Sequence, residues 1–497
     1  MEIIASFVPE SGRDPRVELS HPPAGATMVE IRADLLGVES DFAAVLAACP
    51  RPVVLTLRSA AEGGQGPDDP GARHAFFART AELPVAFFDL EARRDCDLLA
   101  AILPRERVIL SWHDPSGTPR DLEEQAAALL ARGTRLVKLV PEARTLADVT
   151  AVLRLAQALS RGRTEHRRAI VFATGEVGRG TRLASPLLAA PVAYAAWSER
   201  RLAAAGQYTA AELLALIGHL QGRPQRTFAV LGKPVCGSLS PRMHAAAYRA
   251  AGLPNLFIPL EVSEEDELAE VIAPAGETCL DRAGLPAGGF AVTMPWKEAA
   301  ARRCGVLAPR AQRAGVANTI LPRAGKILGD CTDIDGISRV LGELGVELGG
   351  VRALVLGAGG AARAAVVALQ LGGAEVALAG RDVARTAELA RRLGAVAAEP
   401  RDSEQVRVVV NATPAGRDGA PDGWLETLRA PAGAAIVDLP YGEAPTFLEQ
   451  LAAARGWDYA GGREVLLYQG VAQFAAMTGV APPVRAMAAA VGLEEVE

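Results

Sequence analysis

The sequence predicts an α/β protein in two parts: a (β/α)8 barrel, then a two-lobed α/β unit that ends in a doubly wound lobe. Three observations predict this fold class. Short apolar runs alternate with Ala- and Leu-rich helical stretches over about the first 220 residues. A polar, helix-breaking segment follows at residues 221–226. Further on, residues 351–363 join an apolar run, a glycine turn and an Ala-rich stretch.

The first part contains eight candidate strands, the number and chain length typical of a TIM barrel. Helical stretches separate most of them, for example residues 122–131 and 146–160. In chain order the predicted strands are Glu2–Phe7, Met28–Ala33, Val53–Leu57, Val85–Leu90, Val108–Trp112, Leu136–Val140, Ala169–Ala173 and Pro191–Ala195.

Polar side chains in this part follow the carboxyl ends of the predicted strands. A barrel of this type places its chemistry at those ends. A random scatter of charged residues would not track the strand ends in this way. The residues are Glu30, Arg32, Arg58, Asp89, Glu91, His113 and Lys138.

Lys138 lies within the otherwise apolar run at residues 135–140. Burying an ammonium group is costly, and burial favours the neutral amine, which forms a Schiff base with a ketone. His113 ends the preceding strand, and histidine moves protons near neutral pH. Each residue alone is also compatible with an ordinary strand end or loop, but the pair predicts eliminase or aldolase chemistry.

Composition excludes several classes of protein. The chain has 497 residues, too many for one core, and a net charge of −6 with no basic stripe, so we expect no nucleic-acid partner. No apolar run is long enough to span a bilayer, and we read no secretion signal at the N-terminus. Six scattered cysteines show no zinc-binding spacing, which predicts reduced thiols, a cytoplasmic location and no metal site.

The segment at residues 221–226 predicts a domain boundary. We expect a barrel at residues 1–220, a substrate-binding lobe at 226–340, and a nucleotide-binding lobe at 341–497 whose C-terminal helices return to the substrate-binding lobe.

The glycine turn predicts a dinucleotide site, because glycines let backbone amides approach a pyrophosphate at a helix start. The next apolar run, residues 375–379, leads to Gly380, Arg381 and Asp382. An NAD site usually has an acidic residue at this strand end, whereas an arginine suits the 2′-phosphate of NADP. Arg381 therefore predicts NADP as the cofactor.

Polar residues ahead of the glycine turn suggest a polyhydroxy acid substrate. Ser238 and Ser240 would point the same way from an extended segment and can hold a carboxylate. Lys297 and Asp333 form a pair that can move the proton accompanying hydride transfer. Each of these residues alone is typical of turns or helix caps.

Two family resemblances emerge from these motifs. Residues 1–220 resemble type I 3-dehydroquinate dehydratase, a TIM-barrel Schiff-base enzyme. The matching motifs are Glu30-Ile31-Arg32-Ala33-Asp34, Thr56-Leu57-Arg58 with Glu62-Gly63-Gly64, Ser111-Trp112-His113-Asp114, Val137-Lys138-Leu139, Gly180-Thr181-Arg182 and Gly206-Gln207.

Residues 226–493 resemble shikimate dehydrogenase. The matching motifs are Ser238-Leu239-Ser240-Pro241, Val292-Thr293 with Pro295 and Lys297, Ala317-Asn318-Thr319, Thr332-Asp333, Gly357-Ala358-Gly359-Gly360-Ala361, Asn411-Ala412-Thr413 and Tyr468-Gln469-Gly470. The two families catalyse consecutive steps, so the order of the halves resembles a bifunctional dehydratase–dehydrogenase of the shikimate pathway.

The resemblance implies roles for named residues of the first part. Lys138 would form an imine with the C3 ketone of 3-dehydroquinate, His113 would move the C2 proton and Glu62 would orient His113. Arg182 would bind the substrate carboxylate. The other implied substrate-binding residues are Ser6, Glu30, Arg32, Arg58 and Gln207.

In the second part the resemblance implies Lys297 and Asp333 as the catalytic pair. The implied shikimate-binding residues are Ser238, Ser240, Thr293, Asn318, Tyr441 and Gln469. The implied NADP-binding residues are Gly357, Ala358, Gly359, Gly360, Ala361, Arg381, Asn411, Thr413, Leu439 and Gly462. Departures from the family motifs at Ala203, Ala291, Cys331 and Asp382 thin the polar shell around both substrates, at ~1 kcal/mol for each lost contact.

Three functions remain open from the sequence. The favoured one is a bifunctional enzyme that dehydrates 3-dehydroquinate and then reduces 3-dehydroshikimate with NADPH. The second is an active dehydratase fused to a dehydrogenase retuned toward quinate, and the third is a metabolite-sensing module without catalysis. Intact Lys138, His113, Lys297 and Asp333 argue against the third.

Overall fold

The computed structural model describes residues 1–98, 101–160 and 168–493. The last four residues of the predicted third domain, 494–497, lie outside the described residues. The chain forms two compact units. The first holds Met1–Thr227, Pro254–Ser263 and Cys279–Pro286, and the second holds Phe228–Leu253, Glu264–Thr278 and Ala287–Glu497.

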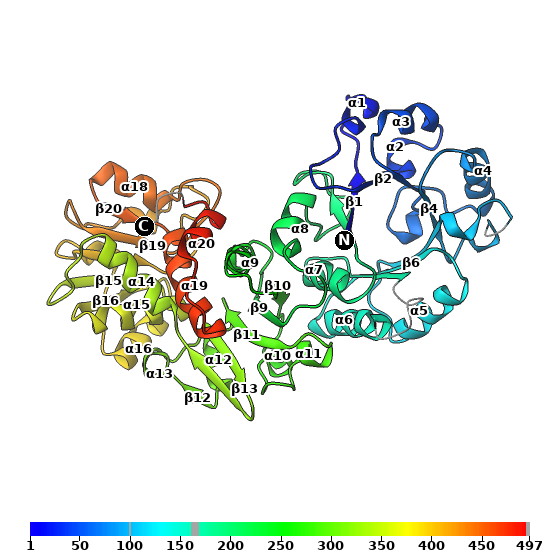
Figure 1. Ribbon diagram of the computed structural model, residues 1–497. Helices are drawn as coiled ribbons and strands as arrows, with labels where there is room; N and C mark the ends of the chain where they lie inside the picture. The colour runs from blue at the N-terminus through cyan, green and yellow to red at the C-terminus, as the bar shows by residue number, and fades with distance from the viewer. Residues whose placement is uncertain (99–100, 161–167, 494–497) are drawn as a thin grey trace. The chain divides into compact units, whose positions relative to one another are not determined.

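The first unit contains a nearly closed barrel of eight strands, coloured blue to green in Figure 1. All of its registered strand pairs are parallel, and β1 pairs with both β2 and β8. The predicted strands are confirmed, with ends that move by one or two residues. They are β1 (Glu2–Phe7), β2 (Met28–Arg32), β3 (Val53–Thr56), β4 (Phe87–Glu91), β5 (Val108–Asp114), β6 (Leu136–Pro141), β7 (Ala169–Val171) and β8 (Val192–Ala196).

Helices surround the barrel, and α4, α5 and α6 lie on its outside in Figure 1. The barrel strands read as near-continuous apolar runs because one face packs on these helices and the other fills the lumen with side chains such as Ile4, Met28 and Ile109. The helices are α1 (Pro15–Leu19), α2 (Ala33–Leu36), α3 (Phe42–Ala48), α4 (Pro70–Thr80), α5 (Leu122–Ala131), α6 (Leu146–Ser160), α7 (Arg179–Leu188) and α8 (Ala210–Ile217). Short 3-10 turns are η1 (Ala60–Glu62), η2 (Cys96–Leu98) and η3 (Arg105–Arg107).

A six-stranded sheet follows, in the order β10-β9-β11-β13-β14-β12. It mixes strand directions, since β13 is antiparallel to β11 and β14. Its strands are β9 (Arg226–Gly232), β10 (Asn255–Glu261), β11 (Ala287–Val292), β12 (Val306–Leu307), β13 (Thr319–Arg323) and β14 (Lys326–Asp330). Its helices are α9 (Ser240–Ala250), α10 (Leu268–Val271) after η5 (Glu265–Glu267), α11 (Cys279–Arg282), α12 (Lys297–Arg303) and α13 (Pro309–Ala314).

The third sheet has the order β17-β16-β15-β18-β19-β20, and its pairs are all parallel. This is the strand order of a doubly wound dinucleotide-binding fold, with the switch point beside β15. Its strands are β15 (Arg352–Leu356), β16 (Glu375–Ala379), β17 (Val396–Ala397), β18 (Val408–Asn411), β19 (Ala435–Asp438) and β20 (Asp458–Ala460).

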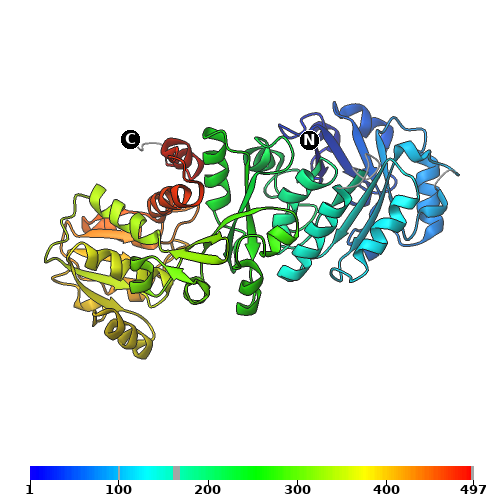
Figure 2. The ribbon, with the colours of Figure 1, turned by 60° about the horizontal axis from the view of Figure 1, so that its bottom comes forward.

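Helices of this region are α14 (Asp333–Glu343), α15 (Gly360–Leu371), α16 (Val383–Leu393), α17 (Gly423–Glu426), α18 (Phe447–Arg455), α19 (Gly462–Thr478) and α20 (Val484–Ala490), with η6 (Pro400–Asp402). The two C-terminal helices, drawn in red in Figure 2, pack on each other and on α9. Helix α19 also packs along α14.

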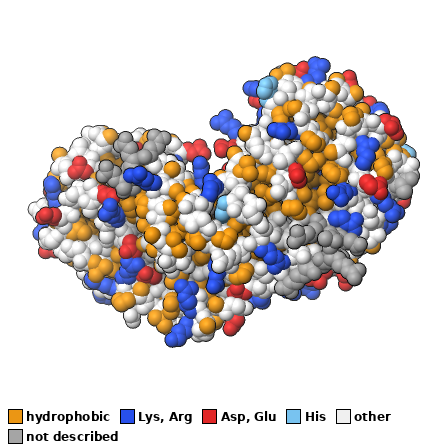
Figure 3. Space-filling view, in the orientation of Figure 1, with side chains coloured by type: hydrophobic (Ala, Val, Ile, Leu, Met, Phe, Trp, Pro, Cys, Tyr) orange, Lys and Arg blue, Asp and Glu red, His pale blue; other side chains and the backbone are white. Residues whose placement is uncertain are grey.

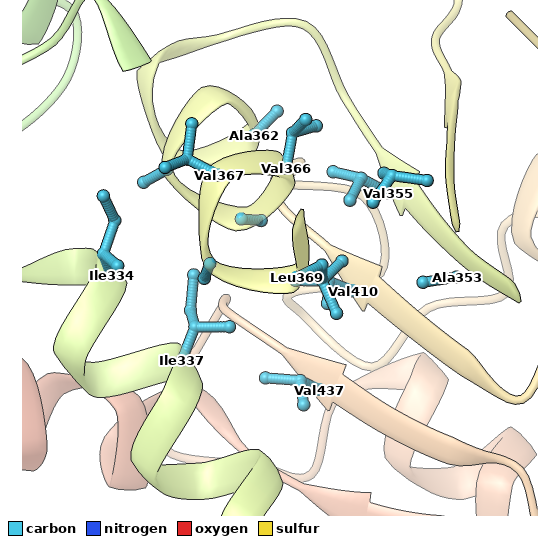
Figure 4. Packing of buried hydrophobic residues seen from close by; sticks show 14 of the residues in the cluster. Ile334, Ile337, Ala353, Val355, Ala362, Val366, Val367, Leu369, Val410 and Val437 are labelled. Atoms are coloured by element: carbon cyan, nitrogen blue, oxygen red, sulfur yellow. The ribbon is translucent and has the colours of Figure 1, made fainter. Parts of the chain in front are cut away.

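The core beneath α14 and α15 fixes where the polar residues at their ends lie. Ile334 and Ile337 of α14 face α15, and Val355, Val410 and Val437 come from three neighbouring strands (Figure 4). Burying a branched side chain of this size contributes about 1.5–3 kcal/mol. Asp333, which begins α14, is therefore held by a well-anchored helix.

On the face shown in Figure 3, acidic and basic side chains are interspersed among apolar ones. Within the described parts of the chain, no helix is long and apolar enough to cross a membrane.

Candidate functional site

Nine predicted residues of the first part line one cavity of about 330 Å³ at the carboxyl ends of the barrel strands. They come from β1, β2, β5 and β6, from η1 and α7, and from loops that follow the strands. The structure therefore brings these sequence candidates together at one place. They are Ser6, Glu30, Arg32, Arg58, Glu62, His113, Lys138, Arg182 and Gln207.

Lys138 projects from β6 into this cavity with only 3% of its side chain exposed. Its Nζ lies 2.5 Å from Oδ2 of Asp89 and 3.9 Å from Oε1 of Glu30. The ammonium also sits over the ring of Tyr194, 4.5 Å from the centroid. A lysine held so closely by buried partners is oriented toward a ligand in the cavity.

Asp89 is a partner that sequence reasoning noted at a strand end but gave no role. It is fully buried on β4, and its Oδ1 accepts from Nη2 of Arg58 at 2.7 Å and from the Ser111 hydroxyl at 2.6 Å. Burial raises the pKa of Asp89, but the charges of Lys138 and Arg58 outweigh it and lower the pKa to about 2. The carboxylate therefore stays ionised beside Lys138.

His113 lies next to the last residue of β5 and contacts Glu62 twice. Its Nδ1 lies 3.2 Å from Oε2 of Glu62, and its backbone N–H donates to the same oxygen at 3.0 Å. Burial and the nearby Arg58 and Lys138 charges lower the pKa of His113 well below its usual range. The ring is therefore neutral, and an ionised Glu62 fixes the proton on Nδ1 and leaves Nε2 as the proton acceptor.

Glu62 itself has an unusual environment on η1. Burial raises its pKa to about 7, although Arg58 Nη1 lies 3.2 Å from its Oε2. Protonation of Glu62 near neutral pH would weaken its hold on His113.

The remaining polar residues of this cavity are arranged in pairs. The Ser6 hydroxyl donates to Oε2 of Glu30 at 2.6 Å, and the neighbouring strands place the two residues in register. Arg32 forms a two-point ion pair with Asp34. Gln207 accepts from the backbone N–H of Ala203, where the resembling family usually has a serine.

Arg182 has the surroundings of an anion-binding residue. Its guanidinium lies 4.5 Å from the centroid of the Phe172 ring, and burial lowers its pKa to about 10. Its Nε has no hydrogen-bond partner among the described residues. A buried donor without a partner favours a ligand that supplies an acceptor, such as a carboxylate.

A second cluster forms around Lys297 and Asp333, which begin α12 and α14. Nζ of Lys297 lies 2.5 Å from Oδ2 of Asp333. Nδ2 of Asn318 donates to Oδ1 of Asp333 at 2.9 Å and to Oε1 of Gln469 at 3.3 Å. Four predicted residues of the second part are thus joined by hydrogen bonds.

Three further predicted substrate-binding residues lie after two adjacent strands of the second sheet. Ser238 and Ser240 follow β9, and the Ser240 N–H donates to the Ser238 hydroxyl at 3.3 Å. Thr293 follows β11, and its N–H donates to the Leu231 carbonyl of β9. Tyr441 is a half-buried phenol whose pKa is raised by burial and lowered in part by a hydrogen bond with the Leu239 backbone.

The glycine turn between β15 and α15 leaves the start of the helix without a side-chain cap. Gly357 has φ +118°, a conformation that other residues rarely adopt, and no side chain caps the start of α15 at Gly359. A Cβ on Gly360 would lie 2.9 Å from Cβ of Lys297. The turn with Ala358 and Ala361 therefore lies directly beside the Lys297–Asp333 pair.

Other predicted cofactor-binding residues contact each other, either through hydrogen bonds or by close approach. Asn411 accepts from both the N–H and the hydroxyl of Thr413 and donates to buried Asp438 at 2.8 Å. A Cβ on Gly462 would lie 2.1 Å from the Leu439 carbonyl, so only glycine fits there. These four residues shape the loops around the glycine turn.

Arg381 lies just after β16, with 66% of its side chain exposed. Its Nη2 lies 2.7 Å from Oδ2 of Asp422, and its guanidinium is 5.8 Å from the Trp424 ring centroid. Sequence reasoning did not foresee Asp422, which also caps α17. The guanidinium is open to solvent on its other side and can meet a phosphate.

No group of three or more His, Cys, Asp or Glu that could hold a metal ion occurs in residues 1–98, 101–160 and 168–493.

A barrel cavity around a buried lysine, and a Lys–Asp pair beside a dinucleotide-type glycine turn, define a two-part α/β protein with two separate sites. Residues 10–224 match the family type I 3-dehydroquinase. Residues 230–320 match the shikimate dehydrogenase substrate binding domain, and residues 462–491 match the shikimate 5′-dehydrogenase C-terminal domain. The chain belongs to the type I 3-dehydroquinase family in its first half and to the shikimate dehydrogenase family in its second half.

Several relatives span these regions. The pentafunctional AROM polypeptide of Malassezia globosa is 31% identical over 94% of this chain, which spans only 31% of that relative. The shikimate dehydrogenase (NADP(+)) of Halobacterium salinarum is 36% identical over 53% of this chain and 97% of its own length.

Among solved structures, shikimate 5-dehydrogenase from Thermus thermophilus, in complex with NADP(H) and shikimate, is 34% identical. The match covers 54% of this chain and 98% of that one, with a TM-score of 0.47. The structure of dehydroquinate dehydratase and shikimate dehydrogenase from S. pombe AroM is 24% identical. The match covers 99% of this chain and 98% of that one, with a TM-score of 0.44.

Proposed function

We propose that the chain is a bifunctional enzyme. The barrel dehydrates 3-dehydroquinate to 3-dehydroshikimate, and the second half reduces 3-dehydroshikimate to shikimate with NADPH. The observation that carries the first activity is Lys138, buried 2.5 Å from Asp89 in the cavity that His113 also lines.

In the dehydration, Lys138 first releases one ammonium proton, and the neutral amine attacks the C3 ketone. The ketone oxygen then takes up two protons, one from Nζ and one from solvent, and leaves as water, which forms a protonated imine. The imine withdraws electrons, so the C2 proton becomes acidic and Nε2 of His113 removes it. The resulting enamine expels the C1 hydroxyl, which leaves as water with the proton from His113. Hydrolysis of the imine then releases the product and restores Lys138.

The barrel residues supply the electrostatics of these steps. The ionised Asp89 balances the positive imine nitrogen, and Glu62 keeps Nε2 of His113 ready to accept a proton. Arg182, with its unpartnered Nε, suits the substrate carboxylate.

The second site fits a dinucleotide cofactor. The uncapped start of α15 and the positive φ of Gly357 leave backbone N–H groups for a pyrophosphate, and Arg381 suits a 2′-phosphate. NADPH, when bound, supplies the hydride. Lys297 would donate a proton to the ketone oxygen, while Asp333 and Asn318 hold that lysine and the substrate hydroxyls.

The substrates are small molecules, and neither site calls for a nucleic acid. We also propose a cytoplasmic location, which is supported by six cysteines that are all free thiols.

A coupled assay tests this proposal. The purified chain is given 3-dehydroquinate and NADPH, and both 3-dehydroshikimate and shikimate are quantified over time. Formation of both compounds supports two active sites. Accumulation of 3-dehydroshikimate without oxidation of NADPH would contradict the second activity, and absence of 3-dehydroshikimate would contradict the first.

A further inference from the structure

A chain of buried hydrogen bonds leads from the interior of the second unit to Asp333. It starts at His244 of α9, whose Nε2 lies 3.2 Å from Oε1 of Gln473 on α19. Nε2 of Gln473 donates to the Asn318 carbonyl at 3.1 Å and to the Thr319 hydroxyl at 3.0 Å. His244, Gln473 and Thr319 are at most 1% exposed, and none is among the predicted site residues.

The direction of each hydrogen bond follows from counting protons. Both N–H groups of the Gln473 amide are used by Asn318 and Thr319, so its Oε1 accepts from His244. Burial lowers the pKa of His244 to about 4, although the bond to Gln473 raises it, so the ring is neutral with its proton on Nε2. Thr319 accepts from Gln473, which leaves its own hydroxyl proton to donate to Oδ1 of Asn318 at 3.0 Å.

These donors decide which way the Asn318 amide points. Oδ1 of Asn318 also accepts from the Thr332 N–H at 2.7 Å and from the Thr332 hydroxyl at 3.2 Å, so the oxygen side of the amide is fully occupied. Nδ2 must then face Asp333, to which it donates at 2.9 Å. The opposite amide orientation would place its oxygen against the carboxylate oxygen, which is repulsive.

We propose that Gln473 is a positioning residue for the second site. Through Thr319, and together with Thr332, it fixes the Asn318 amide, and Asn318 in turn holds Oδ1 of Asp333 so that Oδ2 stays on Lys297. His244 fixes Gln473 from the opposite side. This inference rests on the proposed reduction of 3-dehydroshikimate, in which Lys297 and Asp333 move the proton.

The network lies one helical turn from a predicted substrate residue. Gln469 and Gln473 are four residues apart on α19, so both lie on the same side of the helix. Both side chains form hydrogen bonds with Asn318. Gln469 reaches the amide of the Asn318 side chain, whereas Gln473 reaches only its backbone and the neighbouring Thr319. Gln473 therefore acts through other residues rather than on the substrate.

Thr319→Val gives the sharpest test, because it keeps the shape of the side chain and removes the hydroxyl that links Gln473 to Asn318 and also contacts the Thr332 hydroxyl at 3.1 Å. We expect kcat for 3-dehydroshikimate reduction to fall ~10-fold or more, as one misplaced buried hydrogen bond implies, with the Kd for NADPH unchanged. Thr319→Ser restores the hydroxyl and should recover most of kcat. Gln473→Leu should reproduce the Thr319→Val loss.

Phe474→Leu is the matched control. Phe474 is fully buried beside Gln473, and its ring stacks on His244 at 6.3 Å without joining the hydrogen bonds. This variant should lower the thermal midpoint while kcat stays within about twofold of the native value, well below the tenfold that 1.4 kcal/mol represents.

The outcomes separate the inference from the proposed function. If the native chain does not oxidise NADPH with 3-dehydroshikimate, the proposed function fails. If the native chain is active and folded Thr319→Val keeps its kcat, the positioning role of the network is wrong. A Gln473→Leu protein that does not fold leaves the Thr319 pair to decide.

Discussion

The Asp89 carboxylate and the Lys138 ammonium group lie 2.5 Å apart in the barrel, with Arg58 on the other carboxylate oxygen. Because the Lys138 and Arg58 charges keep Asp89 ionised, the carboxylate faces the nitrogen on which positive charge persists when an imine forms. The relationship places a permanent counter-charge at the centre of the proposed dehydration.

Replacing Asp89 with Asn should therefore slow dehydration strongly. Without the counter-charge the protonated imine loses its stabilisation, and we expect kcat to drop roughly 100-fold, as for the loss of other preorganised electrostatic groups. Steady-state dehydration measured by absorbance checks this. Asp95→Asn is the control, because Asp95 is equally buried but pairs with Arg73. A similar loss of kcat in both variants would mean that Asp89 acts only on stability.

Glu62 should give the dehydration a pH dependence near neutrality. Its pKa is raised to about 7, so it takes up a proton as the pH falls through 7 and then no longer holds the Nδ1 proton of His113. We expect kcat/KM to decline below about pH 7, and Glu62→Gln to lower activity ~10–100-fold and abolish that limb. If the decline of kcat/KM below about pH 7 persisted unchanged in Glu62→Gln, a group other than Glu62 would cause it.

The raised pKa of Glu62 also makes the free energy of unfolding depend on pH. The pKa of folded Glu62, about 7, lies above that of an unfolded glutamate, about 4.3, so the folded state binds this proton more tightly. Its stabilising contribution is fully present below pH ~4 and is lost as the pH rises through 7. Urea unfolding at several pH values should show a flatter dependence in Glu62→Gln than in the native chain.

Arg381→Ala should shrink the preference for NADPH over NADH. The guanidinium offers a charged partner to a 2′-phosphate, which NADH lacks, so kcat/KM for NADPH should fall ~10-fold while that for NADH changes little. Asp422→Asn removes the ion-pair partner of Arg381 but keeps the guanidinium. It therefore separates the effect of losing the ion pair from the effect of losing the guanidinium. Equal specificity constants for both cofactors in the native chain would contradict the assignment of Arg381.

The boundary at residues 221–226 remains a prediction that fragments can test. Fragments 1–220 and 226–497 should each keep one activity, since each contains a complete set of site residues. Helix α7 contacts β10, and a Cβ on Gly180 would lie 2.4 Å from the Pro259 carbonyl. Fragment 1–220 lacks that segment, so its thermal midpoint should fall by roughly 5 °C or more. Aggregation of both fragments would show that they share a core.

The barrel strands and the polar residues at their ends could be predicted from the sequence because both follow local patterns. The pairing of Lys138 with Asp89 could not, since it depends on how β4, β5 and β6 align: Ser111 lies opposite Lys138, and Glu91 lies opposite Ser111. Tyr194 under the Lys138 amine comes from β8, far along the chain. Strand register sets such contacts, and no single sequence window contains it.

The residues of the second site also divide into those that the sequence predicts and those that it does not. Lys297, Asp333 and Asn318 carry recognisable motifs, whereas Gln473 is one glutamine in a largely apolar helix and His244 is one histidine in another helix. Their link exists only because α9 and α19 pack together. Packing between distant helices, rather than any local pattern, brings them into one network.

The most direct test of the account is reduction of the purified chain with sodium borohydride in the presence of 3-dehydroquinate, followed by peptide mass spectrometry. Imine chemistry predicts a covalent adduct on Lys138 and none in Lys138→Ala, which should also lose dehydration but keep NADPH-dependent reduction of 3-dehydroshikimate. An adduct-free Lys138, or a Lys138→Ala chain that still dehydrates its substrate, would contradict the Schiff-base mechanism.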